Sequence, residues 1–354
     1  MAAAIGNTVK GGNNERFNNN YDFLRIVAAT CICFTHSFNL LNKDALEPLM
    51  RISGQRYDFS FIGLSIFFTI SGYLITRSVY TSSSFLSYLW KRFLRIQPLL
   101  ILVCILMVVV IGPLFTTLTL QGYFATPQTW TYFRNIFPAT GIQFVLPGVF
   151  ANNYHANSVN GSLWTLIVEE RLYLLVGIFF FFKPYKKAFA YLILLANFLV
   201  VFKGFLFSQS TQTYLEGSHV FYALLFLNAG ALYQLGVDFP ALLKNKKAWL
   251  GLLVLIISFA VTPMHFLLVL AIPFGVLTVS HIKAPTNRAG QWGDFTYGVY
   301  IFAFPVQQML IACKLFVDSP HTLFAATMTI VFPLAACSWH LLEKRCLNLK
   351  KLVA

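Results

Sequence analysis

The chain has 354 residues, of which 57% are hydrophobic and only 11% are charged, and its mean hydropathy is +0.67. Soluble globular proteins carry about 25% charged residues, so this composition excludes a soluble enzyme, a disordered chain and a small disulfide-stapled module. The net charge of +14 lies in short basic clusters between apolar runs, which indicates membrane orientation and not nucleic-acid binding.

Residues 1–20 are polar and rich in Asn and Gly, and they contain no apolar stretch before a small-residue cleavage site. We therefore expect a mobile cytoplasmic tail and not a cleaved signal peptide. The six cysteines form no Cys-x-x-Cys pair and most of them lie in apolar runs. This pattern predicts small buried apolar residues.

A membrane-spanning helix needs about 20 apolar residues, and ten apolar segments approach this length. They predict an all-α bundle with spans near residues 23–42, 60–78, 98–116, 162–182, 188–207, 219–236, 248–262, 264–281, 294–314 and 321–342. The seventh and eighth form one run that Pro263 divides, because proline lacks an amide donor. Most of the 26 Lys and Arg residues then fall on one side, which places both termini in the cytoplasm. Residues 21–345 would form the bundle, and 346–354 a short basic cytoplasmic tail.

The long external segment, residues 117–161, is rich in aromatic residues, among them Trp130. Aromatic rings are favoured at the membrane interface, so this segment is interpreted as a lid that lies on the interface. The alternative is a surface on which a sugar ring stacks.

Ionisable side chains inside predicted spans are candidates for function, because a charge at mid-bilayer costs several kcal/mol. Only Glu169 and Glu170 among the acids, and His36 among the histidines, lie well inside a span. At about 1.5 Å per residue, His36 lies about 9 Å and Glu169 about 12 Å below the outer ends of their helices. The two predict either a carboxylate-oriented general base or a buried polar contact between helices.

Arg25, and the pair Arg92 and Arg95, add to this pattern. Arg25 precedes His36 by eleven residues, so both share one helix face about 16.5 Å apart along the axis. Arg25 is either part of a site or a snorkelling anchor. Arg92 and Arg95, in the expected loop before the third span, share a helix face, and Pro98 marks the entry to that span. They fit a cytoplasmic diphosphate ligand, or an orientation cluster that contacts anionic lipid.

Five short motifs follow one another along the chain. They are Arg25-x10-His36; the apolar Gly63–Ile75 segment with Phe67-Phe68 and Ser71-Gly72; Lys91-Arg92-Phe93-Leu94-Arg95-Ile96-Gln97-Pro98; Asn160–Leu166 followed by Glu169 and Tyr173; and Thr296–Tyr300 with a closing Glu343-Lys344. Together they resemble the membrane-bound acyltransferase-3 family of bacterial O-acyltransferases over about residues 20–345. Two departures are Arg345, where the family usually has proline, and the expected lack of a fused hydrolase-like domain.

The resemblance implies an enzyme of the bacterial inner membrane that moves an acyl group, usually acetyl, from cytoplasmic acetyl-CoA to a hydroxyl of an envelope glycan. Lipopolysaccharide O-antigen and exopolysaccharide are such acceptors. It implies catalytic roles for His36 and Glu169, coenzyme binding by Arg25, Ser71, Lys91, Arg92 and Arg95, and acceptor binding by Trp130, Trp164 and Tyr173. His36 would activate the acceptor hydroxyl for direct attack, or take the acyl group itself.

Two other classes of protein fit the composition. A transporter or flippase of a lipid-linked glycan or small polar solute would also carry Arg, Glu and His inside the membrane. A receptor or scaffold would leave the Arg25, His36 and Glu169 arrangement without a role. The sequence has no HExxH motif or P-loop, and neither a metal nor nucleic acid is expected to take part.

Overall fold

The computed structural model describes residues 19–156, 158–207, 219–261 and 267–353. Within these residues the chain is helical, and the only strand-like pairing is one isolated bridge between Thr116 and Val149. The predicted all-α fold is therefore confirmed. The predicted tail, apart from its last two residues, and the predicted break at Pro263 lie outside the described residues.

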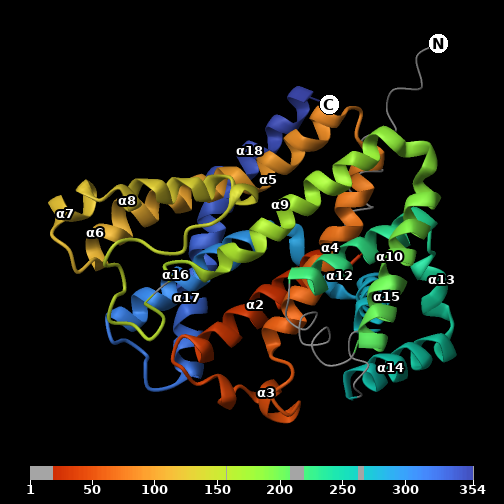
Figure 1. Ribbon diagram of the computed structural model, residues 1–354, viewed down its shortest axis with the longest axis horizontal. Coiled ribbons are helices and arrows are strands. Elements are labelled where there is room, and N and C mark those ends of the chain that lie inside the picture. Colours follow the sequence, from red (N-terminus) through yellow and green to blue (C-terminus); the bar gives the residue numbers. More distant parts are fainter. Residues whose placement is uncertain (1–18, 157, 208–218, 262–266, 354) are drawn as a thin grey trace. The chain divides into compact units, whose positions relative to one another are not determined.

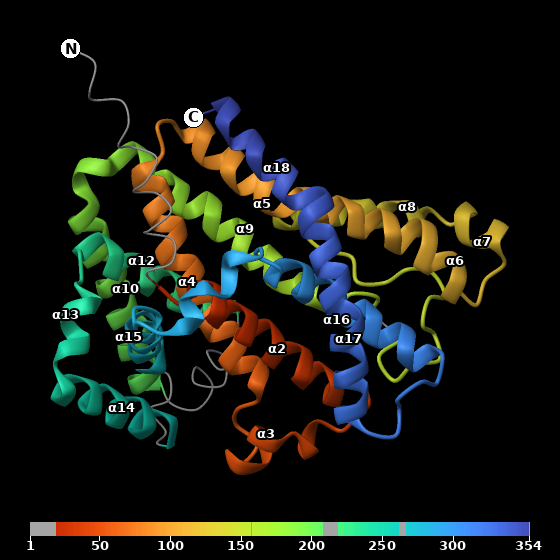
Figure 2. The same cartoon turned by 180° about the vertical axis from the view of Figure 1, so that it is seen from behind.

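Within the described residues, each predicted span overlaps one longer helix, in the same order along the chain, and short helices lie in several of the connections (Figures 1 and 2). The longer helices are α2 (Tyr21–Asn39), α4 (Phe59–Thr81), α5 (Phe85–Leu106), α9 (Trp164–Gly177), α10 (Lys186–Phe207), α12 (His219–Leu235), α14 (Lys246–Val261), α15 (Leu268–Ser280), α16 (Thr296–Ala312) and α17 (Pro320–Ser338). The short ones include α3 (Pro48–Ile52), α6 (Gly112–Phe115), α7 (Leu120–Ala125), α8 (Pro127–Thr131), α13 (Phe239–Lys244) and α18 (Lys344–Asn348).

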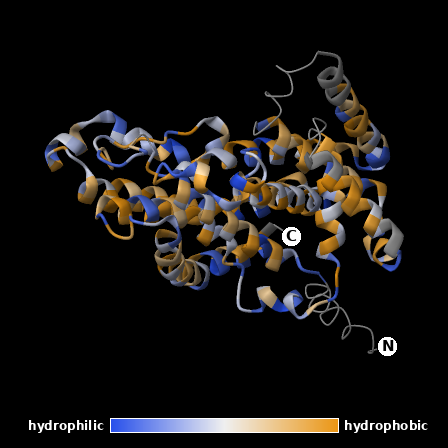
Figure 3. Ribbon diagram, turned by 90° about the horizontal axis from the view of Figure 1, so that it is seen from below, coloured by the Kyte–Doolittle hydropathy of each residue, from blue (hydrophilic) through white to orange (hydrophobic). Residues whose placement is uncertain are grey.

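In the described part of the chain, three continuous helical stretches are long and apolar enough to cross a membrane: Phe59–Thr81, Phe85–Phe115 and Pro320–Leu352. A fourth would be the pair Leu268–Ser280 and Pro285–Gln291, which bends by 88°. Colouring by hydropathy shows how apolar residues dominate the long helices (Figure 3). Large apolar side chains also lie exposed along α10 and α14, as expected of surfaces that face lipid. These features agree with a membrane protein, whereas the count of ten spans stays a prediction.

The helix that carries Arg92 and Arg95 begins earlier than the sequence predicted. The expected loop before Pro98 is wrong, because α5 starts at Phe85 and contains Pro98 in its interior. The Ser84 side chain caps the helix by accepting a hydrogen bond from the Ser87 amide at 3.0 Å. Proline removes one backbone hydrogen bond, but strong helix formers such as Leu99 and Leu100 follow it and favour continuation of the helix. Both arginines are therefore held on a rigid helix.

The described residues of the predicted short tail are helical. Helix α18 and the 3-10 turn η10 (Leu349–Val353) continue from α17, through a turn of π-helix, η9 (Trp339–Glu343). Helix α18 lies beside α5 in both ribbon views (Figures 1 and 2). The Trp90 indole donates a hydrogen bond to the Leu349 carbonyl at 3.1 Å, which holds this end against α5.

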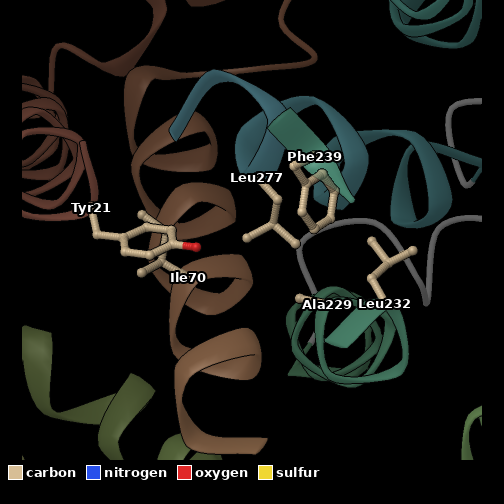
Figure 4. Packing of buried hydrophobic residues seen from close by; sticks show 6 residues of the cluster. All are labelled: Tyr21, Ile70, Ala229, Leu232, Phe239 and Leu277. Atoms are coloured by element: carbon tan, nitrogen blue, oxygen red, sulfur yellow. The ribbon is translucent and has the colours of Figure 1, made fainter. Parts of the chain in front are cut away.

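The chain divides into two compact units. Unit 1 comprises residues 1–27, 65–77 and 184–294, and unit 2 comprises residues 28–64, 78–183 and 295–354. Figure 4 shows the core of unit 1, in which six buried residues pack together: Tyr21, Ile70, Ala229, Leu232, Phe239 and Leu277. Unit 1 also holds a mutual pair of amide hydrogen bonds between Asn197 and Asn228, at 2.8 and 3.0 Å.

Unit 2 contains α5, α9, α16 and α17 and most of the candidate residues. Helices α16 and α17 pack closely at Gly298, where a Cβ atom would lie 2.8 Å from the Ala335 methyl. The external segment belongs to this unit and is built from α7, α8 and short 3-10 turns. The cysteine prediction holds for Cys33 and Cys104, which are buried, but Cys313 and Cys337 are exposed.

Candidate active site

His36 lies in the last turn of α2, in an apolar setting. Its ring packs edge-on against Phe304 of α16, with ring centroids 5.3 Å apart and planes at 83°. Phe304 fits there because residue 161 is glycine, at which a Cβ atom would meet the phenyl ring at 2.5 Å. The Nδ1 atom of His36 is buried and has no hydrogen-bond partner among the described residues. Such an atom costs about 1–3 kcal/mol, so a ligand is a natural partner for it.

A buried glutamine fixes this part of α2 against α16. The Gln307 side chain donates hydrogen bonds to the Cys33 carbonyl at 2.9 Å and to the Ser37 hydroxyl at 2.7 Å. Both acceptors lie within one turn of His36. The orientation of the imidazole is therefore set by the packing of two helices, with little freedom for adjustment.

A second histidine lies near His36, which the sequence analysis left without a role. The Nε2 atom of His155 donates to the carbonyl of Asn39 at 2.7 Å, one turn beyond His36, and the two histidines interact electrostatically. Its backbone is held by Gln308, whose amide donates to the His155 carbonyl at 2.8 Å and to the Ser158 carbonyl at 2.7 Å. No local sequence pattern links residues 36 and 155.

Glu169 lies in a polar setting on α9. The Tyr173 hydroxyl, one turn later on the same helix, donates a hydrogen bond to its carboxylate. The Arg92 guanidinium carbon lies 6.0 Å from the centroid of the Tyr173 ring and interacts electrostatically with Glu169. The Nε atom of Arg92 is buried without a hydrogen-bond partner in the described part of the chain. The three residues form one charged cluster between α5 and α9.

Tyr173 and Arg92 are among the groups that interact with Glu169, and a contact between Glu169 and His36 is not tested by them. The predicted orientation of His36 by Glu169 therefore stays a prediction. The hydrogen bond from Tyr173 could have been found in the sequence, since residues four apart on a helix are neighbours. Tyr173 itself is only 6% exposed, which suits contact with Glu169 better than contact with a glycan at the surface.

Arg95 forms an ion pair with a glutamate at the far end of the chain. Its guanidinium lies 3.7 Å from the Glu343 carboxylate, and both side chains are largely buried. The Ser338 hydroxyl donates to the same carboxylate at 2.9 Å. The turn of π-helix at residues 339–343 carries Glu343, and such turns often occur at functional sites. No sequence spacing predicts this pair, because its two residues lie on segments that are distant along the chain.

The other predicted coenzyme-binding residues are distributed over both units. Lys91, beside Arg92 on α5, donates to the Ser82 hydroxyl at 3.0 Å. Arg25 and Ser71 belong to unit 1. There, Arg25 forms an ion pair with Asp294 at 2.9 Å, a partner that the sequence analysis missed.

The predicted acceptor-binding residues also differ in exposure. Trp130, on α8 in the external segment, is 50% exposed and stacks on Phe133, with centroids 6.5 Å apart and planes at 25°. Its indole donates to the Phe124 carbonyl at 2.8 Å. Trp164 is the first residue of α9 and is half-buried. Trp130 therefore has the accessible face that stacking on a sugar requires.

Glu170, beside Glu169, has a structural contact. Its carboxylate accepts hydrogen bonds from the Gln97 amide at 2.6 Å and from the Ala139 backbone amide at 2.8 Å. It thereby ties the external segment to α5 and α9. Among the described residues, no group of three or more His, Cys, Asp or Glu side chains is placed to hold a metal ion.

Comparisons with known proteins agree on one family. The acyltransferase-3 family model, described as an acyltransferase domain, matches residues 18–340. An O-acetyl transferase from Shigella phage Sf6 is 29% identical over 350 residues, covering 94% of this chain and 96% of that protein. Nodulation protein 10 from Rhizobium leguminosarum bv. viciae is 28% identical over 383 residues, covering 96% and 97%. No solved structure matches the chain.

Proposed function

The chain belongs to the acyltransferase-3 family and is an acyltransferase, and we propose that it transfers an acyl group, usually acetyl, from cytoplasmic acyl-CoA to a hydroxyl of an envelope glycan. The name of the phage relative supports acetyl as the group. The transporter and scaffold alternatives have no comparable support. The observation that carries the proposal is the buried Nδ1 atom of His36, which has no partner in the described residues and lies in the family's Arg-x10-His motif.

The donor would bind through the basic side chains of α5. Arg92 and Arg95 suit the coenzyme's phosphates, because guanidinium groups form paired hydrogen bonds with phosphate oxygens. Lys91 adds a third cation on the same helix. Arg25 and Ser71 would contact the pantetheine arm, which runs outward along the first span. The required reach is about 16.5 Å, the axial separation of Arg25 and His36.

His36 would act as the general base. In direct transfer, the imidazole takes the proton of the acceptor hydroxyl while the hydroxyl oxygen attacks the thioester carbonyl. The carbon–sulfur bond then breaks, and the proton passes from the imidazolium to the departing thiolate. In the alternative route the imidazole attacks the thioester carbonyl, the carbon–sulfur bond breaks, and coenzyme A leaves as the thiol with the imidazole proton. In a second step the acceptor hydroxyl attacks the acyl-imidazole, the carbon–nitrogen bond breaks, and the hydroxyl proton returns to the imidazole.

Glu169 supports this chemistry through its electrostatic field. Its carboxylate would stabilise the imidazolium of His36 or hold Arg92 ready for the donor. Tyr173 donates a hydrogen bond to Glu169 and lies against Arg92, and so it would couple the position of the carboxylate to that of the guanidinium. The acceptor sugar would stack on the exposed ring of Trp130 and contact Trp164 near the start of α9.

A transfer from cytoplasmic donor to external acceptor requires a defined orientation in the bacterial inner membrane. We propose ten spans with both termini in the cytoplasm, from the excess of Lys and Arg on that side. Reporter fusions at the C-terminus should be active in the cytoplasm, and a fusion at Gly141 in the external segment should be active outside. A C-terminal fusion that is active outside would contradict this topology.

The most informative test of the function is mass analysis of the envelope glycans with and without the gene. Loss of a mass increment that corresponds to one acetyl group per repeat, restored by the wild-type gene, is the expected result. Unchanged glycans combined with loss of transport of a lipid-linked precursor would favour the flippase alternative.

A further inference from the structure

Two lysines from different segments of unit 2 converge on one serine. Lys91 of α5 donates to the Ser82 hydroxyl at 3.0 Å, and Lys183 donates to the Ser82 carbonyl at 2.8 Å. Ser82 is the residue at which α4 ends and is 3% exposed. Its own hydroxyl hydrogen is donated to the Ser78 carbonyl at 2.7 Å. Ser82 therefore acts as an acceptor that holds two ammonium groups close together.

Among the described residues, no negative charge pairs with these two positive charges. The charged groups that act on Lys91 are Arg92 and Lys183, both positive. Like charges held this close repel one another, so the arrangement is unfavourable until an anion joins it.

The position of Lys183 is fixed by further contacts. Its ammonium lies 4.0 Å from the centroid of the Phe180 ring, a favourable cation–π contact. The backbone departs from helical geometry at Phe182, with φ −123° and ψ 28°, and this kink precedes Lys183. Each ammonium has three hydrogens and uses one on Ser82, so both retain donors for a ligand.

We propose that Lys91 and Lys183 form a phosphate subsite that takes the terminal phosphomonoester of the acyl donor, beside Arg92. A phosphomonoester carries about −1.5 to −2 charges near pH 7 and so matches two cations. A lipid phosphodiester carries one negative charge and matches them less well. The compact ammonium groups suit this point charge, whereas the planar guanidinium of Arg92 suits the diphosphate. This subsite rests on the proposed function and deepens it.

The test compares coenzyme A with 3′-dephospho-coenzyme A, which lacks only the monoester. Both are titrated against the full-length protein in nanodiscs of zwitterionic lipid. The Lys183→Gln and Lys91→Gln variants should each lose about tenfold in affinity for coenzyme A and keep the wild-type affinity for the dephospho form. Lys183→Arg, which keeps the charge, should retain most of the preference for coenzyme A. Lys186→Gln, three residues along the chain, is the matched control and should behave as wild type.

Four outcomes would overturn the subsite. An equal loss of affinity for both ligands in the lysine variants would show that the lysines do not bind the monoester. Unchanged affinity for both would show that they only anchor the end of α4. Competition by phosphatidylglycerol nanodiscs, with no preference for coenzyme A in the wild type, would assign the cluster to lipid. Failure of the wild type to bind either coenzyme would contradict the proposed donor as well, and so separates the two hypotheses.

Discussion

His36 and Glu169, the two residues expected to work together, have opposite surroundings within the same unit. The imidazole lies against the Phe304 ring, and its Nδ1 atom has no hydrogen-bond partner in the described residues. The carboxylate accepts from Tyr173 and lies in the field of Arg92. An atom left unsatisfied inside a folded protein is unfavourable without a ligand, whereas the Glu169 carboxylate already has a hydrogen-bond donor and a nearby cation within the fold.

This difference suggests separate tasks for His36 and Glu169, which the sequence analysis treated as one catalytic pair. His36 has the features of the group that contacts the reacting atoms. Glu169 belongs to a cluster that includes Arg92, the residue expected to hold the donor. Variants that change the surroundings of one residue and leave those of the other intact test whether the two tasks are separate.

The largest effect is expected for His36→Ala. Loss of a general base lowers turnover by about 10²–10⁴-fold, and the loss should appear in turnover per folded molecule in detergent or nanodiscs. The matched control is His321→Ala, because His321 also packs on α2 through Phe34 and Phe38 but is exposed. If His36→Ala retained near wild-type turnover while His321→Ala did not, the catalytic assignment would move away from His36.

Glu169→Gln should reduce transfer strongly, and the kinetic constant that changes reports which partner matters. A lower kcat with an unchanged KM for the donor is expected if the carboxylate acts on His36. A raised donor KM is expected if it acts through Arg92. Tyr173→Phe removes the hydroxyl that donates to Glu169 and should give the same kind of change at a smaller magnitude. Opposite changes in the two variants would show that Tyr173 and Glu169 do not act as one cluster.

Replacement of Arg92 by Ala should weaken coenzyme A binding by about tenfold or more, because a charge-assisted contact is worth about 1.5–3 kcal/mol. Arg95→Ala alone would leave the Glu343 side chain, 3% exposed, without its ionic partner, and this destabilises the fold. The cleaner variant combines Arg95→Ala with Glu343→Gln. Isothermal titration of the folded protein measures the affinity, and unchanged affinity in both variants would make these arginines orientation anchors.

The smallest effect on chemistry is expected at Glu170, next to Glu169. Glu170→Ala leaves the Gln97 amide and the Ala139 backbone amide without their acceptor, which costs about 1–3 kcal/mol of stability. A thermal-shift measurement should show a lower Tm, with turnover per folded molecule close to wild type. A large loss of turnover at unchanged Tm would place Glu170, and not Glu169 alone, among the residues that serve the reaction.

The sequence predicted the helices well and their partners poorly, for a physical reason. Hydropathy identifies apolar helices because each spanning segment must itself carry apolar side chains, whether they are buried in the bundle or face lipid. It missed the start of α5, because Pro98 is tolerated inside a packed helix. Glu169 and Tyr173, four residues apart, were open to prediction.

The ion pair of Arg95 with Glu343, and the meeting of Lys91 with Lys183 at Ser82, depend on packing between segments that are distant in sequence. No local pattern encodes such contacts. The same holds for His155, whose approach to the end of α2 depends on the hydrogen bonds of Gln308.

If the helical bundle moves the acyl group and His36 performs the chemistry, transfer of a labelled acetyl group to the glycan must depend on His36. The most direct measurement uses purified protein in nanodiscs, acetyl-CoA labelled in the acetyl group, and the glycan acceptor isolated from cells that lack the gene. The account predicts that the label appears on the glycan with the wild-type protein and is about 10²–10⁴-fold slower with His36→Ala, although that variant still binds coenzyme A. Transfer at equal rates by both proteins, or no transfer by folded wild-type protein that binds coenzyme A, would contradict it.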